Sequence, residues 1–376
     1  MKPKRFKYIY LLLCVALCIT TISRGYYLKH HTNEGNPFSR AINTIIPEAI
    51  PGINHVIDDS LSDLEETKKM ERTIERFMAQ WEIKGASLAI MKNGKLLYSK
   101  GFGIADSAKG TPVNVSNIFR IASLSKLITA TGIMKLWEEK KLSLDQPVFG
   151  EKGILNDSAF LGIKDPRIRE ITVEHLRHQG GYSIRAGDPL FCTPSVAQSM
   201  QTPLPLSADD MVRFASSTRL RFRPGEGNAY SNLGYVVLGK VIEKVSGMPY
   251  ETFIRDSILI PVGCFDMHIG YSEPDKHFPN EVHYYEPVEC YDGSGRTVPR
   301  SYGGCNLQVL GSAGGWVASP TELMKFITAI DPDDSKPDIL KASTIAYMTE
   351  KDKRKYPIGW MRTTEHDDWS RTGTLA

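Results

Sequence analysis

The sequence predicts an α+β fold in which an antiparallel sheet is split between the two ends of the chain, with a helical lobe inserted between its parts. Three observations support this prediction. A strand-like hairpin lies before residue 100, helical signals fill a long middle, and the ends of the folded part are strand-like. The 376 residues are 41% hydrophobic and 24% charged, near the average of globular proteins, so the chain can bury a sizeable core.

The hairpin is centred on Asn93-Gly94, with apolar runs at 87–91 and 96–99 on either side. This dipeptide is the strongest short hairpin signal, because both residues tolerate positive φ. We therefore expect the antiparallel sheet to begin here.

Helical signals recur through the middle of the chain. Apolar residues stand at helical spacing after Ser123 and again from Val237 to Val245. Elsewhere a capping residue is followed three positions later by a carboxylate, a pattern typical of helix starts. The predicted helices and helix starts are 67–81, 123–141, a helix through His175 and His178, starts at Ser207 and Ser319, and a helix over Val237–Val245 that Gly247 ends.

A basic patch and a short apolar run open the chain. Four basic residues among the first seven precede an apolar run from about residue 8 to residue 22. This order is typical of a secretory signal or an N-terminal membrane anchor. We expect residues 1–23 to be that signal peptide or anchor, 24–68 a polar tether and 69–376 the folded domain. The protein would then be exported, periplasmic or otherwise extracytoplasmic, with a membrane tether if the segment is retained.

Charge and cysteine content narrow the function classes. The net charge of +3 comes without a basic stripe, which argues against a nucleic-acid partner. Four cysteines lie outside the apolar run, and an exported compartment permits either disulfides in three pairings or buried thiols. Because no C-x-x-C pair is present, we expect no zinc site. These cysteines are Cys192, Cys264, Cys290 and Cys305.

Ser123 and Lys126 stand three residues apart in RIASLSKLITATG, residues 120–132. On a helix they share one face, and a serine in the first turn feels the positive end of the helix dipole. A lysine whose pKa is lowered by burial can take the hydroxyl proton and activate the serine. The alternative is a helix cap beside a solvated lysine, since Ser-x-x-Lys occurs by chance about once in a chain of this size.

Two further motifs favour the catalytic interpretation. Tyr230-Ser231-Asn232 follows a Gly-rich loop and precedes a predicted helix, and Arg371-Thr372-Gly373-Thr374 stands near the end. Ser-x-x-Lys, a polar Tyr or Ser motif and then cation-Thr-Gly is the motif set of the active-site-serine penicillin-recognising enzymes.

The surrounding stretches resemble the class C β-lactamase-like family. The similar segments are FRIASLSKLITATG, ITVEHLRHQGG, PGEGNAYSNLGYVVLGKVIEKVSGMPYETFI and GSAGGWVASPTELMKFI, in family order over roughly residues 70 to 376. The resemblance implies the β-lactamase/transpeptidase-like fold: an antiparallel sheet flanked by helices, an all-helical lobe, and a site in the cleft between them.

The resemblance also implies catalytic roles. Ser123 would be the acylated nucleophile, and Lys126 would share its proton. Tyr230 would be the base partner and would protonate the leaving group. Such a site needs no metal and no cofactor.

Substrate-binding roles follow from the same resemblance. Asn232 would hydrogen-bond the substrate amide and steady the lysine. The backbone N–H groups of the nucleophile and of Thr374 would form the oxyanion hole. Arg371 and Thr372 would receive a substrate carboxylate, and Gly373 would admit the backbone close to it.

The sequence departs from the family pattern in two places. The family usually has Lys or His where Arg371 stands, and arginine can grip a carboxylate but cannot transfer a proton. Family members continue past the third motif with further strands and a long helix, whereas this sequence stops at Ala376. We therefore expect the C-terminal part of the domain to be missing from this sequence.

Three other segments attract attention. His175 and His178 could suggest a metal, but no further ligand is obvious and a structural role is expected. The aromatic-rich segment 277–302 could line a cleft or pack on itself. The loop 181–191 could border the pocket, although an ordinary surface loop is the preferred interpretation.

The function hypothesis is a serine hydrolase that forms an acyl-enzyme on Ser123 and acts on an amide or ester bond. The substrate would be a small molecule or peptidoglycan peptide: a D-amino-acid peptide, a β-lactam or a small ester, which the motifs do not distinguish. A second hypothesis is a cell-wall peptide or penicillin-binding module with little turnover, and a third is a scaffolding role. A monomer is expected.

Overall fold

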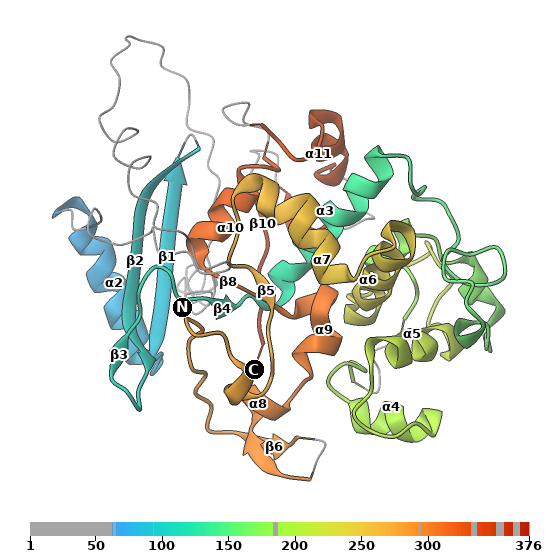
Figure 1. Cartoon of the computed structure of the whole chain (residues 1–376), viewed down its shortest axis with the longest axis horizontal. Coiled ribbons are helices and arrows are strands. Elements are labelled where there is room, and N and C mark those ends of the chain that lie inside the picture. The colour runs from blue at the N-terminus through green and yellow to red at the C-terminus, as the bar shows by residue number, and fades with distance from the viewer. Residues whose placement is uncertain are drawn as a thin grey trace, which may run out of the picture.

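The computed structural model describes residue 62 and residues 65–92, 94–182, 187–292, 295–331, 337–350, 357–363 and 369–375. These residues form a sheet-bearing side and a helix-rich side (Figure 1). The predicted export segment and most of the predicted tether lie outside the described residues, so these divisions stay predictions. Within the described ranges, no helix has both the length and the apolar character needed to cross a membrane.

The N-terminal sheet is a hairpin with one short added strand. Strands β1 (Gly85–Lys92), β2 (Lys95–Asp106) and β3 (Thr111–Pro112) pair antiparallel in the order β1-β2-β3. Gly94 has the positive φ of 67° that the turn requires, which confirms the predicted hairpin, although Asn93 itself is outside the described residues. Helix α2 (Lys68–Gln80) packs the side chain of Met78 against this sheet.

A second ladder joins segments that are far apart in the sequence. Strands β4 (Phe119–Arg120) and β5 (His268–Ile269) both pair antiparallel with the buried β8 (Trp316–Ala318). The prediction of strands split by a helical insertion is thereby confirmed.

Two further ladders complete the described strands. They are β6 (Glu289–Tyr291) with β7 (Thr297–Pro299), and β9 (Arg362–Thr363) with β10 (Trp369–Ser370). Strands of two or three residues support only a few inter-strand hydrogen bonds, so these ladders are far shorter than the β1–β2 hairpin.

The described regular elements of the inserted lobe between β4 and β5 are helices, joined by loops that carry two isolated β-bridges. Its α-helices are α3 (Ser125–Glu138), α4 (Thr193–Met200), α5 (Ala208–Ser217), α6 (Asn232–Ser246) and α7 (Tyr250–Ile254). The helix predicted through His175 and His178 is instead a single 3₁₀ turn, Glu174–Arg177. The turn ends because His178 adopts a φ of −167°, with its ring stacked on Tyr230.

The helices that follow the insertion are α8 (Arg300–Gly303), α9 (Leu307–Gly314), α10 (Pro320–Ile327) and α11 (Ala342–Met348). Helix α3 lies at the centre of the core, against α6 and α9, and nearly every residue from Ser125 to Leu136 is buried. A helix buried on all sides brings whatever polar side chain it carries into the interior.

Both predicted helix starts are confirmed as capped ends, but with different partners. Ser207 and Asp210 form the complete reciprocal capping box of α5. Ser319 caps α10 by accepting the backbone N–H of Glu322. The Glu322 carboxylate does not return to the cap, as a capping box would require. It accepts the backbone N–H groups of Phe265 and Asp266 instead, because the loop before β5 brings those donors to it.

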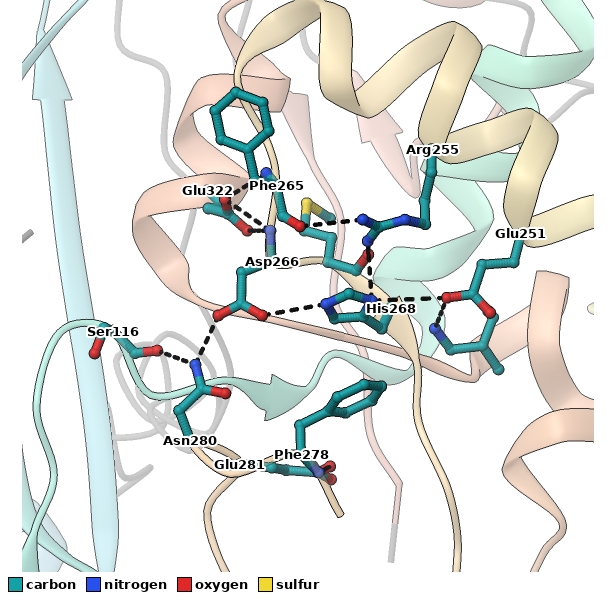
Figure 2. A network of polar contacts seen from close by, with 12 residues as sticks. Ser116, Glu251, Arg255, Phe265, Asp266, His268, Phe278, Asn280, Glu281 and Glu322 are labelled. Carbon is teal, nitrogen blue, oxygen red and sulfur yellow. Dashed lines mark hydrogen bonds and ion pairs between the residues drawn. The ribbon is translucent and has the colours of Figure 1, made fainter. Parts of the chain in front are cut away.

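A polar network ties that loop to α7 and α10 (Figure 2). His268 Nε2 lies 3.2 Å from Asp266 Oδ1, and His268 Nδ1 lies 2.9 Å from Arg255 Nη1. Asp266 Oδ2 accepts from Asn280 Nδ2 at 2.6 Å. Each carboxylate in this network is therefore matched by donors, and the network is structural.

The aromatic-rich segment 277–302 packs on itself around one arginine. The guanidinium of Arg120 lies 4.1 Å from the ring centroid of Tyr284 and 5.6 Å from that of Tyr302. It also donates to the backbone carbonyl of Tyr271. Of the two interpretations left open for this segment, packing on itself agrees with the structure.

The four cysteines outside the N-terminal segment are free thiols. Cys264 is fully buried, and burial raises the pKa of its thiol. Cys192, Cys290 and Cys305 are partly buried. Of the two alternatives that the sequence allowed, disulfides or thiols, the structure has thiols at these four positions.

Candidate functional site

Ser123 lies at the entrance to the buried helix α3. It belongs to a 3₁₀ turn, Ala122–Leu124, that runs directly into α3, and the preceding Ala122 has a positive φ of 48°. A non-glycine residue in this region costs roughly 1–3 kcal/mol and is typical of functional sites. The turn leaves Ser123 only partly buried, whereas the residues on either side of it are buried.

Tyr230 and Asn232 approach Ser123 from the start of α6. Ser231 caps that helix by accepting the N–H of Gly234 at 2.9 Å, which places its two neighbours on the side of α3. The Tyr230 hydroxyl lies 2.6 Å from Ser123 Oγ. The predicted Tyr-Ser-Asn motif therefore meets the predicted nucleophile.

Lys126 lies one turn after Ser123 and is fully buried. Its Nζ is 3.1 Å from Ser123 Oγ, 2.6 Å from Asn232 Oδ1 and 2.6 Å from the carbonyl oxygen of Ala313 on α9. The amine also lies 4.9 Å from the ring centroid of Tyr230. None of these neighbours carries a formal negative charge when the tyrosine is neutral.

This environment lowers the pKa of Lys126 well below its ordinary value. Burial is the largest cause, because a buried ammonium loses its hydration, and the nearby Arg371 cation adds to the effect. Asp188 opposes the shift. A neutral amine donates two hydrogen bonds and accepts one. The two short contacts to Asn232 and Ala313 can take its N–H groups, which leaves the lone pair for the Ser123 hydroxyl.

Arg371 is buried within the site. Its Nε donates to the carbonyl oxygen of Ser123 at 2.8 Å, and its Nη2 donates to the Tyr230 hydroxyl at 3.4 Å. The cation thus holds the nucleophile's backbone and stabilises negative charge on the phenol oxygen.

The rest of the third motif lines the same turn. A Cβ on Gly373 would lie 2.4 Å from the carbonyl oxygen of Ile121 and 2.8 Å from the backbone nitrogen of Ser123, so only glycine fits this close approach. Thr372 and Thr374 are exposed, and the Thr372 hydroxyl lies 3.6 Å from the sulfur of Met361.

The structure adds residues that the sequence did not assign. Asp188 accepts a hydrogen bond from Asn232 Nδ2 at 2.7 Å, so the described part of the loop 181–191 borders the site at this residue, and the interpretation as an ordinary surface loop is wrong. The sequence signal that pointed to this loop was its position directly after the turn at Gly180-Gly181. The Ala313 carbonyl faces Lys126 through backbone geometry, which no side-chain pattern reveals.

His178 packs behind the tyrosine. Its ring stacks on that of Tyr230 at 4.8 Å, and its Nδ1 accepts the backbone N–H of Ser231 at 3.2 Å. Burial, followed by the Arg371 and Lys126 cations, holds the pKa of His178 well below its usual range. A neutral ring facing the tyrosine agrees with the structural role expected for His178. In the described part of the chain, no cluster of three or more His, Cys, Asp or Glu residues is placed to hold a metal ion.

Comparisons with known proteins identify the family. A family model described as Beta-lactamase matches residues 70–375. Esterase EstB of Burkholderia gladioli is 25% identical over 245 residues, covering 62% of this chain and 60% of the esterase. Penicillin-binding protein 4* of Bacillus subtilis (strain 168) is 29% identical over 306 residues, covering 78% of this chain and 63% of that protein.

A solved structure shares the fold. The octameric penicillin-binding protein homologue from Pyrococcus abyssi aligns with a TM-score of 0.59 at 30% identity, covering 78% of this chain and 64% of that one. The chain therefore spans about 60% of the length of these curated relatives.

Proposed function

This chain belongs to the Beta-lactamase family, and we propose that it is a serine hydrolase that cleaves amide or ester bonds through an acyl-enzyme on Ser123. One observation carries the proposal. The Ser123 hydroxyl lies within hydrogen-bond distance of both Lys126 and Tyr230, and the lysine is buried among neutral acceptors. A nucleophile with an activating base in reach is what acyl transfer requires.

Acylation begins with the neutral amine of Lys126. As Ser123 Oγ attacks the carbonyl carbon, its proton passes to Nζ. When the tetrahedral intermediate collapses, the bond to the leaving nitrogen or oxygen breaks, and Tyr230 gives its hydroxyl proton to that atom. The resulting phenolate faces the Arg371 cation.

Deacylation restores every proton. Water gives one proton to the Tyr230 phenolate, and the hydroxide attacks the acyl carbon. The bond from that carbon to Ser123 Oγ breaks, and Lys126 returns its proton to Oγ. The backbone N–H groups of Ser123 and Thr374 are the proposed donors to the developing oxyanion. Removal of one such donor typically costs a factor of about 10²–10³ in rate.

The family supports three substrate classes. A relative named as an esterase favours small esters, and relatives named as penicillin-binding proteins favour β-lactams and D-amino-acid peptides. In the proposed complex Asn232 would contact the substrate amide, and Thr372 with Arg371 would receive its carboxylate. Since Arg371 already contacts Ser123 and Tyr230, we expect it to bind a carboxylate only while retaining those contacts.

Activity-based labelling tests the proposal. The full chain is treated with a fluorescent fluorophosphonate and, separately, with a fluorescent penicillin, with Ser123→Ala as the control. We expect Ser123-dependent labelling by the fluorophosphonate. A folded protein that takes no label, or a Ser123→Ala variant that labels equally, would overturn the assignment.

A second candidate function is a binding module with little turnover, favoured by the arginine in the third motif. The binding module differs from the hydrolase in that its acyl-enzyme is hydrolysed slowly or not at all. Rapid penicillin labelling with no product from p-nitrophenyl esters, a D-alanine amide or nitrocefin would select the binding module. Steady product release would select the hydrolase.

We also propose export, on the N-terminal pattern alone. Expression of the full chain with a C-terminal tag, followed by fractionation, tests this and separates a cleaved signal from a retained anchor. A monomer stays the prediction for this chain, and light scattering of the purified protein compares it with the octameric Pyrococcus homologue.

A further inference from the structure

We propose that Asp188 is a positioning residue that fixes the orientation of the Asn232 amide and thereby aims Lys126 at Ser123. The inference rests on the proposed function, since it concerns how that site is assembled. It adds a residue from the 181–191 loop that orients the site through Asn232.

The Asp188 carboxylate is held at both oxygens. Oδ1 accepts the backbone N–H of Leu190 at 3.0 Å, and Oδ2 accepts Asn232 Nδ2 at 2.7 Å. The backbone carbonyl of Asp188 also accepts the N–H of Phe191 at 3.0 Å. The loop therefore presents one acceptor oxygen to Asn232 in a fixed place.

Two neighbours select a single orientation of the Asn232 amide. A carboxylate only accepts hydrogen bonds, so the NH₂ group must face Asp188. The amide oxygen then faces Lys126 and accepts from Nζ at 2.6 Å. With the amide flipped, the Asn232 NH₂ group would face the Lys126 N–H group that now donates to Oδ1, and the lysine would lose one of its two short acceptors. The remaining acceptor, the carbonyl of Ala313, would not hold the amine in place by itself.

The Asp188 charge has a second effect, which is on the pKa of Lys126 and is separate from the orientation of the amide. The groups that face Lys126 are the Arg371 cation, the rings of Tyr230 and Tyr235, and the nearby Asp188. Asp188 raises the pKa of Lys126, whereas burial and Arg371 lower it. Removal of the Asp188 charge should therefore lower the pKa of the lysine further.

The test is Asp188→Asn, with Asp157→Asn as the matched control. An asparagine has one side-chain oxygen, so it cannot accept from both Leu190 and Asn232 as the aspartate does. We expect the rate of fluorophosphonate labelling to fall at least about tenfold. The acid limb of its pH profile should move to lower pH. Asp157 lies on the surface beside Lys244, and its variant should label at the wild-type rate.

The action through Asn232 is tested in a double-mutant cycle. In an Asn232→Ala background, Asp188→Asn should change the labelling rate on the plateau above the acid limb by less than about twofold, because the amide to be oriented is gone. Independent, multiplicative losses would overturn the positioning role. So would a wild-type labelling rate and pH profile in Asp188→Asn. If wild-type protein shows no Ser123-dependent label, the proposed function fails instead, which separates the two failures.

Discussion

The cluster around Lys126 and the network around His268 both place ionisable groups in the interior, but they differ in how the charges are matched. In the network, Glu322, Asp266 and Arg255 each meet donors or acceptors of complementary character (Figure 2). In the site, Lys126 meets neutral oxygens, and Arg371 lies close enough to lower its pKa further.

This difference separates structure from chemistry. A matched network stabilises one conformation of the loop before β5. A buried amine without a directly bonded carboxylate loses its proton more easily, which is useful only if the amine accepts a proton from a substrate or nucleophile. Sites of this kind are where local rules for stability are commonly broken.

The largest expected effect comes from Lys126→Met. Loss of the base should lower the acylation rate by a factor of about 10²–10⁴. The free energy of unfolding should change by less than about 1 kcal/mol, because relief from burying the amine offsets the hydrogen bonds lost by Asn232 and Ala313. Stopped-flow acylation and urea unfolding measure the two quantities. A large loss of unfolding free energy with little loss of acylation rate would show that Lys126 has a structural role and not a catalytic one.

Glu322→Ala should show the reverse pattern. It leaves the backbone N–H groups of Phe265 and of the buried Asp266 without their acceptor, so we expect a loss of about 3 kcal/mol in unfolding free energy. Glu322→Gln, which keeps one oxygen acceptor, should lose less. Labelling per folded molecule should stay at the wild-type level in both variants. A loss of labelling in the folded variants would show that the polar network around His268 contributes to the Ser123 site.

Ser207→Ala should give the smallest effect, and its loss of unfolding free energy is the reference value for the loss of an ordinary helix cap. It removes the capping box of α5, which lies outside both clusters, and should cost about 1 kcal/mol without altering acylation. Thermal unfolding and labelling check this. A loss of several kcal/mol would mean that α5 supports the lobe more strongly than its cap suggests.

Much of this arrangement was predictable from local signals. The Asn93-Gly94 dipeptide, the cap at Ser207 and the apolar spacing after Ser123 each act within a few residues, and the corresponding elements form. The motif residues Ser123, Lys126, Tyr230 and Asn232 also meet as the resemblance implied, although their catalytic roles stay proposals.

The contacts that were missed depend on the tertiary fold. Asp188 meets Asn232 across 44 positions of sequence, and the Ala313 carbonyl meets Lys126 across 187. Glu322 stands where a capping box predicts a local contact, but the loop before β5 supplies better donors. Likewise, Arg371 turns to the Ser123 carbonyl, because the close packing of Gly373 on Ser123 brings its guanidinium there.

The central claim is that the buried Lys126 is ready to accept a proton from Ser123. The pH dependence of acylation tests this claim most directly. The rate of Ser123 acylation by an uncharged ester is measured across pH in wild-type protein and in Arg371→Met. We predict that the wild-type rate rises through an acid limb well below the ordinary lysine pKa of about 10.4. In Arg371→Met that limb should move to higher pH, because loss of the neighbouring cation lets Lys126 keep its proton longer. A limb near the ordinary lysine value, or one that Arg371→Met leaves in place, would contradict the account.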